Sequence, residues 1–404
     1  LTGGAGADII LGNGSADTIV GNAGADSITG GAGDDIITGG DGTDTFNIDS
    51  GTDTINDLGG SAGGENDVVI VSAGASVTAS NIISFVATSS TQNNSTDASN
   101  AVLTAKSGAG RTISVANATG SSKAFTLVGN NGNDLLTGGA GDDIISVTSA
   151  GQANSDTLDG GAGTDTLTLS SGTHTLTSEN KIVNIENINL STSGSGTNVD
   201  LTGQTEGFTI TAGNFANTIT SGSGADTIVG GTNVDTIKGG AGDDIITGGS
   251  GNDIITIDSG EDKVKDLGGT SGSEQDVVVV NAGATLNAID IIGFTATNAT
   301  KNDSTNANNA KLTAKDGAGR TIDVSLATGS SKAFKISGGD GGDILTGGAG
   351  ADIILGNGSA DTIVGNAGAD SITGGAGDDI ITGGDGNDII TIDSGEDKVK
   401  DLGG

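Results

Sequence analysis

Residues 3–11 read GGAGADIIL, and residues 12–20 continue in the same frame as GNGSADTIV. Aspartate recurs at the sixth position of each nine-residue unit, and a large apolar residue follows two positions later, as Ile28 follows Asp26. This pattern is the nonapeptide G-G-x-G-x-D-x-U-x, where U is a large apolar residue. A fixed short period predicts a repeat architecture in which each unit buries its apolar residue against its neighbours.

The aspartates at the sixth position fall into four blocks. They are Asp8, Asp17, Asp26, Asp35, Asp44 and Asp53; Asp134, Asp143, Asp156 and Asp165; Asp226, Asp235, Asp244, Asp253 and Asp262; and Asp343, Asp352, Asp361, Asp370, Asp379, Asp388 and Asp397. Two positions depart from the pattern, because Asn217 replaces an aspartate and four extra residues precede Asp156. We expect a doubtful site at Asn217 and a distorted one at Asp156. The units of Asp53, Asp262 and Asp397 lack the leading glycines, which predicts weak binding at the ends of the arrays.

Longer repeats order these blocks. Residues 3–42 are identical to residues 347–386, and Asp57–Leu136 resembles Asp266–Leu345. The domain organisation that we predict alternates repeat arrays with β-rich spacers. The arrays are residues 1–60, 129–169, 213–269 and 338–404, and the spacers are residues 61–128, 170–212 and 270–337.

The nonapeptide predicts one half of a coil. Glycine-rich residues make the turn, and the last three residues form a short strand with the apolar side chain pointing inward. Two nonapeptides close a coil, and stacked coils place Asp8 above Asp26 on one edge and Asp17 above Asp35 on the other. Stacked carboxylates about 5 Å apart repel by roughly 1 kcal/mol in water and by about 3 kcal/mol at an effective dielectric constant near 20.

A cation reverses the sign of this repulsion. Ca²⁺ takes six to eight hard oxygen ligands, which carboxylates and the carbonyls of glycine-rich turns can supply. Mg²⁺ is the rival ion, but it retains water and requires a smaller octahedron, so the pattern favours Ca²⁺. Because the binding free energy becomes folding free energy, we expect the arrays to fold when calcium binds.

The sequence resembles the RTX (repeats-in-toxin) family, most clearly at residues 30–37 (GGAGDDII) and 239–246 (GGAGDDII). The resemblance implies an all-β fold, a right-handed parallel β-roll or β-solenoid, with the 22 aspartates of the four blocks as side-chain ligands of several Ca²⁺ ions. It also implies type I secretion and folding outside the cell. The spacers resemble those of surface-layer and sheath proteins of this type. They either continue the stack as wider coils, which we favour, or form separate β-sandwiches.

Composition excludes several classes of protein. The chain has 51 acidic and 15 basic residues, a net charge of −36, so it lacks the basic surface that nucleic-acid binding requires. It has no cysteine, and we find no apolar run long enough for a transmembrane helix. The single histidine, His174, lies in an alternating stretch and is predicted to face solvent in a structural role. Zinc-protease and serine-hydrolase motifs are absent, so we do not expect an enzyme.

The leading hypothesis is an extracellular, calcium-dependent structural protein at the bacterial cell surface. It would assemble with copies of itself into a surface layer, sheath or filament, and a cell-surface polysaccharide is a further candidate partner. The alternatives are a stalk segment of a large RTX adhesin or, less favoured, the secretion tail of an RTX toxin or hydrolase. Because the chain begins and ends inside a repeat, we expect it to be part of a longer chain or a processed product.

Overall fold

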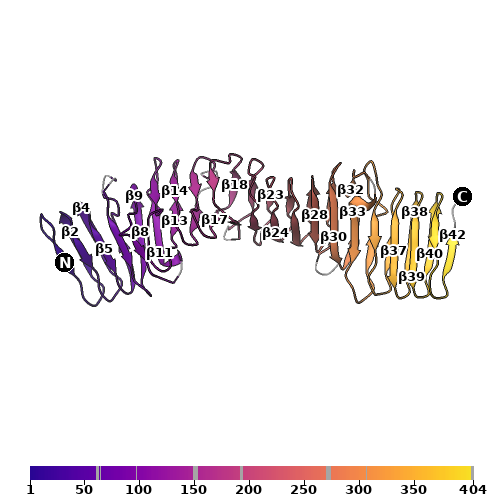
Figure 1. The fold of residues 1–404 in the computed structure, drawn as a ribbon, viewed down its shortest axis with the longest axis horizontal. Helices are drawn as coiled ribbons and strands as arrows, with labels where there is room; N and C mark the ends of the chain where they lie inside the picture. Colours follow the sequence, from indigo (N-terminus) through magenta and orange to yellow (C-terminus); the bar gives the residue numbers. More distant parts are fainter. Residues whose placement is uncertain are drawn as a thin grey trace. The chain divides into compact units, whose positions relative to one another are not determined.

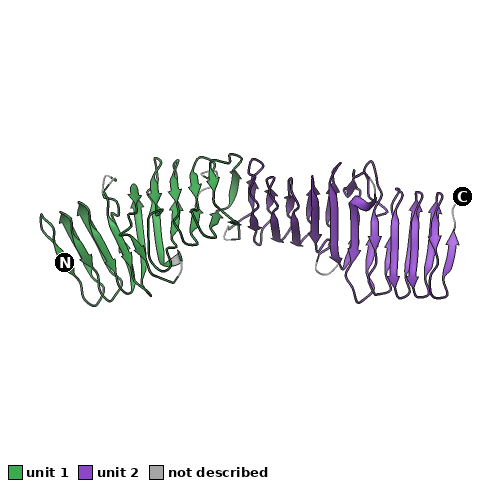
Figure 2. Cartoon of the chain, in the orientation of Figure 1, with its two compact units in different colours: residues 1–194 green, residues 195–404 purple. Residues whose placement is uncertain are grey.

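The computed structural model describes residues 1–60, 63, 65–96, 98–148, 153–191, 194–269, 274–305 and 307–401. The chain divides into two compact units, residues 1–194 and 195–404, which are coloured separately in Figure 2. Each unit is a stack of coils built from parallel strands. We describe the units one at a time.

In unit 1, most successive strands lie on opposite walls of the coil (Figure 1). One wall contains β2 (Thr18–Ala23), β4 (Ile36–Asp41), β6 (Thr52–Ile55), β8 (Ser76–Ile82), β11 (Ala101–Ala105), β13 (Thr126–Gly129), β15 (Ile144–Val147), β17 (Thr166–Leu169) and β20 (Asn187–Asn189). The other wall begins with β1 (Ile9–Leu11), β3 (Ser27–Thr29), β5 (Thr45–Ile48), β7 (Val68–Val71) and β10 (Gln92–Asn93). It continues as a separate sheet of β9 (Ser84–Val86), β12 (Thr112–Ser114), β14 (Leu135–Thr137), β16 (Thr157–Asp159) and β19 (Ile182–Val183). A short 3₁₀ turn (Ala98–Asn100) and strand β18 (Gly172–Thr175) complete the unit.

Unit 2 has the same plan. One wall contains β22 (Thr209–Thr211), β24 (Thr227–Thr232), β26 (Ile245–Ser250), β28 (Glu261–Lys265), β30 (Thr285–Ile291), β33 (Ala310–Ala314), β35 (Lys335–Ser337), β37 (Ile353–Gly358), β39 (Ser371–Ala376) and β41 (Ile389–Thr391). The other wall begins with β21 (Thr197–Asp200), β23 (Thr218–Thr220), β25 (Thr236–Lys238), β27 (Ile254–Ile257), β29 (Val277–Val280) and β32 (Lys301–Asn302). It continues as β31 (Gly293–Thr295), β34 (Thr321–Asp323), β36 (Ile344–Thr346), β38 (Thr362–Ala367), β40 (Ile380–Asp385) and β42 (Lys398–Asp401). A second 3₁₀ turn spans Ala307–Asn309.

The apolar residue of each nonapeptide points into the coil and stacks on its equivalent in the next coil. Ile19 pairs with Ile37, and Ile37 pairs with Ile55, in parallel register. All three side chains are fully buried. Turns between strands demand glycine where coils approach closely. Gly33 has φ +134°, and a Cβ there would lie 2.5 Å from the carbonyl carbon of Ser15 in the preceding coil. The stack is therefore held by an apolar ladder inside and by close backbone contact at the turns.

The spacers that follow the first and third arrays continue the coil. In unit 1, β7 pairs with β5 of the array, and β8 pairs with β6. In unit 2, β29 and β30 pair with β27 and β28 in the same way. Phe85 and Phe294 fill the interior of these spacers. The favoured alternative of a continuous stack therefore describes these residues, and the separate β-sandwich does not.

The expected all-β parallel solenoid is confirmed. Within the described ranges, the helical residues are the two three-residue 3₁₀ turns. None of the helices found there is long and apolar enough to cross a bilayer.

Candidate metal sites

The aspartates at the sixth position form ladders along the edges of the arrays. The backbone N–H of Asp8 donates to Oδ1 of Asp26 at 2.7 Å, and that of Asp26 donates to Oδ1 of Asp44 at 2.8 Å. On the other edge Asp17 donates to Asp35 at 2.8 Å. Each bond joins residues 18 apart, so one carboxylate from every coil is held in place by the coil before it.

The structure extends this contact to almost every predicted ligand. All 22 aspartates except Asp8 and Asp17 accept such a backbone N–H bond on Oδ1, at 2.5–3.0 Å. Asp8 and Asp17 donate in the same ladders. The remaining aspartates are buried, apart from Asp388 and Asp397, which like Asp8 and Asp17 are partly exposed. The pattern therefore identified the residues that the coils bring together on each edge.

The second oxygen of these carboxylates is buried without a hydrogen-bond partner in most of the ladder. This holds for Oδ2 of Asp17, Asp26, Asp35, Asp44, Asp53, Asp156, Asp165, Asp235, Asp244, Asp253, Asp361, Asp370, Asp379, Asp388 and Asp397. Buried polar atoms are almost always paired, and a buried, unpaired charge is strongly unfavourable. A row of such oxygens is therefore the signature of a ligand that the protein atoms do not supply.

A backbone oxygen lies beside the unpaired carboxylate oxygen. The point that a Cβ on Gly230 would occupy is 2.7 Å from Oδ2 of Asp235 and 2.5 Å from the carbonyl oxygen of Gly248 in the next coil. Only glycine leaves this space open. Two hard oxygens from different coils thus face one small cradle, which is the donor chemistry that Ca²⁺ prefers.

Burial and mutual repulsion change the acidity of the ladder. Burial raises the pKa of Asp235 to about 7, and the charge of Asp253 in the next coil adds to the effect. Burial also raises the pKa of Asp53 to about 6, with further contributions from Asp35, Asp49 and Asp34. Both shifts have the direction that burial and repulsion between carboxylates impose, and a bound cation would oppose them.

Side chains alone do not complete a metal site. Within the ranges that the structure describes, no three or more histidine, aspartate or glutamate side chains are grouped closely enough to hold an ion. The residues present fit calcium if adjacent-coil carboxylates act together with turn carbonyls. Carboxylates and turn carbonyls together would supply the kind of hard oxygen ligand that Ca²⁺ takes.

The ladder hydrogen bonds continue through Asp156 and Asn217, and the weaker calcium sites expected there stay predictions. Despite the insertion, Oδ1 of Asp156 accepts the backbone N–H of Asp134 at 2.8 Å. Asn217 keeps the ladder bonds as well, because Oδ1 accepts from Thr197 at 3.0 Å and its backbone donates to Asp235 at 2.7 Å. The amide of Asn217 brings no negative charge to its position.

The prediction that His174 faces solvent is wrong. Its side chain is fully buried on β18, and Nε2 donates to the carbonyl oxygen of Ser170 at 2.9 Å. Burial lowers the pKa of His174, which favours the neutral ring. Alternation of residues along a strand shows that the strand has two faces. It does not show which face the coil encloses, so the prediction placed His174 on the wrong one.

Three carboxylates continue the ladders beyond the predicted set. Oδ1 of Asp67 accepts the N–H of Asp44, and Oδ1 of Asp276 accepts that of Asp253, both at 2.8 Å. Oε2 of Glu186 accepts the N–H of Asp165 at 2.7 Å. Asp67 and Asp276 lack the glycine-rich lead but keep an apolar residue two positions later, as Asp-x-Val. That shorter signal, Asp-x-U alone, could have found them.

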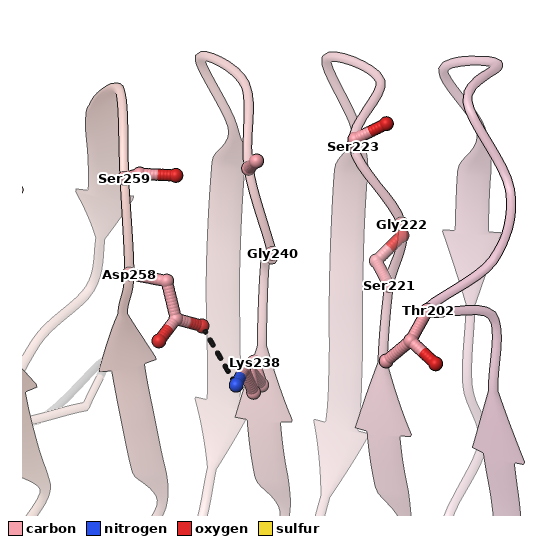
Figure 3. A pocket seen from close by; sticks show the side chains of 9 residues that line it. Thr202, Ser221, Gly222, Ser223, Lys238, Gly240, Asp258 and Ser259 are labelled. Atoms are coloured by element: carbon pink, nitrogen blue, oxygen red, sulfur yellow. Dashed lines mark ion pairs between the residues drawn. The ribbon is translucent and has the colours of Figure 1, made fainter.

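The array of residues 213–269 also contains an ion pair between a lysine and an aspartate. Lys238 Nζ lies 3.3 Å from Oδ2 of Asp258 in the following coil (Figure 3). The pair borders a shallow hollow of about 320 Å³ that Ser223 and Ser259 help to line. Asn281 donates to the other oxygen of Asp258 at 2.7 Å. The carboxylate of Asp258 is thus neutralised by protein groups and in this respect differs from the ladder carboxylates.

Comparison with known families agrees with this geometry. The family described as RTX calcium-binding nonapeptide repeat (4 copies) matches the chain repeatedly, and the matches together cover more than half of its 404 residues. They span residues 1–28, 20–55, 126–147, 148–173, 209–237, 229–264, 337–372, 355–390 and 364–399. The chain belongs to the RTX calcium-binding nonapeptide-repeat family. No curated protein matches the sequence.

RTX membership covers the four arrays and leaves most of the spacers unmatched. Of the spacer that follows the first array, 61–128, only its last residues fall within a match, and none of 270–336 does. The family therefore accounts for the ladders and their turns. The spacer coils, and the carboxylates where arrays meet spacers, are properties of this chain that the family match does not describe.

Proposed function

We propose that this RTX chain is an extracellular structural solenoid whose arrays fold when Ca²⁺ binds to the aspartate ladders, and that it assembles into a surface layer, sheath or filament. RTX repeat proteins are typically secreted by type I secretion. The observation that carries the proposal is the row of buried Oδ2 atoms without partners. Each would ligate an ion together with turn carbonyls of an adjacent coil.

Calcium changes the sign of the contribution that the ladder carboxylates make to the free energy of folding. Without the ion, burial and the charges of neighbouring carboxylates raise the pKa of the ladder aspartates and oppose folding, as burial and the charge of Asp244 do at Asp262. With the ion, the same charges become ligands, and the free energy of binding is added to the free energy of folding. A chain of this kind stays unfolded at low calcium and folds at the higher calcium concentration outside the cell.

Assembly is favoured over catalysis by what surrounds the ladders. The one histidine is buried, and its one hydrogen bond joins it to a backbone carbonyl. The repeated blocks, identical over 3–42 and 347–386, present the same surface more than once along one chain. Repeated identical surfaces suit a regular layer or filament.

The experiment combines circular dichroism and negative-stain electron microscopy with a calcium titration. We expect a transition from coil to β-structure followed by regular sheets or filaments. Separate rods after the same transition would replace assembly by a stalk function in a large adhesin. No transition would overturn the proposal.

A pair of variants tests the ladder itself. Asp361→Asn keeps an acceptor for the N–H of Asp343 and removes the buried charge. It should raise the calcium concentration at the transition midpoint several-fold. The control Asp340→Asn removes the same charge from an exposed side chain and should leave the midpoint unchanged. Equal midpoints for the two variants would contradict the assignment of the ladder.

A further inference from the structure

The first coil of each array that follows a spacer holds its ladder side chains differently from the coils after it. Three arrays follow a spacer, and each begins with one ladder position on either edge. These six leading positions are Asp134 and Asp143, Asn217 and Asp226, and Asp343 and Asp352. One coil later, Oδ2 is buried without a hydrogen-bond partner at all six positions, namely Asp156, Asp165, Asp235, Asp244, Asp361 and Asp370. At the five leading aspartates, by contrast, protein groups bind both carboxylate oxygens.

One oxygen of each leading aspartate is bound to the spacer. Oδ1 accepts a backbone N–H from the preceding coil at 2.5–2.8 Å. The donors are Arg111 for Asp134, Phe125 for Asp143, Phe208 for Asp226, Arg320 for Asp343 and Phe334 for Asp352. Each donor stands where the ladder elsewhere has an aspartate, so the preceding coil brings no ladder carboxylate to a leading aspartate.

At four of the five leading aspartates, the other oxygen is bound by the aspartate's own turn. Oδ2 accepts the backbone N–H of the residue four positions earlier, at 2.6–3.2 Å. The pairs are Asn130–Asp134, Gly139–Asp143, Gly339–Asp343 and Gly348–Asp352. A Cβ on Gly138 would still lie 2.6 Å from Oδ2 of Asp143, so a donor and not a loss of space distinguishes this site. Hydrogen bonds to a carboxylate favour its charged form, which is the role that a cation would have elsewhere in the ladder.

The local sequence does not distinguish such a closed turn from an open one. The six residues GGAGDD occur at 30–35, 138–143, 239–244 and 374–379. In three of these four segments the second glycine has a φ between +100° and +104°, and Oδ2 of the final aspartate is unpaired. In the segment 138–143 the φ of Gly139 lies outside the left-handed region, and its N–H is turned to the carboxylate. Identical residues thus form an open turn at three places and a closed turn at one.

The coil on which the turn packs differs between the two cases. In an open turn, Gly33 has φ +134° and packs on an array coil, where a Cβ would lie 2.5 Å from the carbonyl carbon of Ser15. In the closed turn, the equivalent Gly141 lies outside the left-handed region and packs on the spacer, where a Cβ would lie 2.5 Å from the backbone nitrogen of Ala124. Contact with the spacer therefore accounts for the closed turn.

Side chains close the leading positions of the array 213–269. Ser221 stands where most units have their first glycine, and its hydroxyl donates to Oδ2 of Asp226. On the other edge the residue is Asn217, whose Oδ1 accepts the N–H of Thr197 at 3.0 Å and whose Nδ2 donates to the carbonyl oxygen of Phe215 at 2.5 Å. An uncharged amide that is satisfied on both sides needs no cation. Different groups thus reach the same result as the backbone donors of the other two arrays.

We propose that the leading positions do not bind calcium, and that each array after a spacer binds it only from its second coil on. The inference rests on the proposed function, because it divides the aspartates to which that function assigns the ion. The leading coil folds together with the spacer before it and without calcium. It then offers the next coil an ordered edge, so calcium is required only for the coils with unpaired carboxylate oxygens.

The test makes the same substitution in two identical turns. Asp143→Asn changes the last residue of the closed GGAGDD segment, and Asp379→Asn changes that of an open one. Native mass spectrometry of the full chain at saturating calcium counts the ions, and circular dichroism during a calcium titration gives the midpoint. We expect Asp379→Asn to carry at least one Ca²⁺ fewer and to raise the midpoint several-fold. Asp143→Asn should carry the wild-type number at the wild-type midpoint.

A second closed variant guards against a folding defect at Asp143. In Asp226→Asn the new amide can donate to the hydroxyl of Ser221, so the contact is kept when the charge is removed. This variant should also carry the wild-type number of ions. Hydrogen exchange in excess chelator adds a readout without calcium, in which the amides of Phe125 and Gly139 should stay protected because Asp143 accepts both.

The outcomes separate this inference from the proposed function. If Asp143→Asn and Asp226→Asn lose as many ions as Asp379→Asn, the inference is overturned and the ladder remains the calcium site. If Asp379→Asn keeps every ion of a wild type that binds many, the ladder assignment itself is overturned. A wild type that binds no calcium overturns both. Circular dichroism at saturating calcium confirms that the variants being counted are folded.

Discussion

The arrays and the spacers of this chain differ in the polar groups that they bury in their turns. Both stack parallel coils and must satisfy polar groups inside the turns. In the arrays the buried group is a carboxylate with one oxygen unpaired, as in Asp35. In the spacer of unit 1 it is the amide of Asn93, whose Oδ1 accepts the N–H of Ser95 at 2.9 Å and whose Nδ2 donates to the carbonyl oxygen of Ala124.

The spacer of unit 2 uses the same device. Asn302 accepts the N–H of Ser304 at 2.9 Å and donates to the carbonyl oxygen of Ala333 at 2.5 Å. An amide carries both a donor and an acceptor, so it can be satisfied entirely by protein groups. A carboxylate has only acceptors and a charge. The ladder carboxylates therefore keep an unpaired oxygen that a cation could bind, whereas backbone groups satisfy the amides of Asn93 and Asn302.

Removal of calcium should separate the two regions most strongly. In excess chelator we expect the arrays 1–60 and 213–269 to lose most amide protection, because their ladders repel. The spacer coils around Asn93 and Asn302 should retain more protection. Hydrogen–deuterium exchange with and without calcium measures this. Equal loss in arrays and spacers would show that the spacers depend on calcium as well.

Asn93→Ala should destabilise the spacer and leave the calcium dependence of the arrays unchanged. It leaves the buried carbonyl of Ala124 without its donor, which should reduce the stability of the spacer by about 1–3 kcal/mol. The effect should be the same at saturating and at limiting calcium, since no ion is involved. Urea unfolding followed by hydrogen exchange over 61–128 is the measurement. The control Asn131→Ala truncates an exposed side chain and should change little. A shift in the calcium midpoint with Asn93→Ala would contradict the separation.

Acidification should act on the arrays in opposite directions with and without calcium. Burial raises the pKa of Asp235 and Asp352 to about 7, above their value in the unfolded chain. The calcium-free folded array therefore binds more protons than the unfolded chain. Its stability is greatest below the unfolded pKa, near 4, and is lost as pH rises through about 7.

The measurement is circular dichroism at several pH values. In chelator, we expect more β-structure at pH 5 than at pH 8. In calcium titrations, the midpoint should rise on acidification, because protons compete with the ion for the carboxylates. A calcium-free chain that loses β-structure on acidification would show that the buried ladder aspartates do not control folding.

The smallest effect on stability is expected from the ion pair between Lys238 and Asp258. Lys238 is about half exposed, with 45% of its side chain accessible, so its attraction to Asp258 is screened by solvent. Lys238→Met should cost less than about 1 kcal/mol and should weaken further in salt. Thermal unfolding at saturating calcium, compared with the exposed control Lys106→Met, checks this. A larger loss would place Lys238 among the groups that hold the coils together.

Much of the fold followed from local pattern. The nine-residue period predicted coils of 18 residues, and Ile19, Ile37 and Ile55 stack in that register. The alignment of the aspartates along the coil edges also followed from the pattern, because a residue at a fixed position in each repeat must align with its equivalents. That the aspartates bind calcium remains the proposal that the ion titrations test.

The missed residues share a physical cause. Asp67 and Asp276 lie 23 residues after their partners, outside the 18-residue frame. Glu186 lies 21 residues after Asp165 and has a longer side chain. A scan for the full nonapeptide cannot find a carboxylate whose coil is longer than two nonapeptides.

The sequence by itself determined the period, the inward apolar residue and the stacking of aspartates on two edges, since each depends on geometry that repeats within a few residues. Only the tertiary structure decided that the spacers 61–128 and 270–337 extend the stack, that His174 points inward, and that Asp67 and Asp276 continue the ladders beyond Asp44 and Asp253. These features depend on how coils of unequal length close upon one another. Closure is a property of the stack, and no single repeat encodes it.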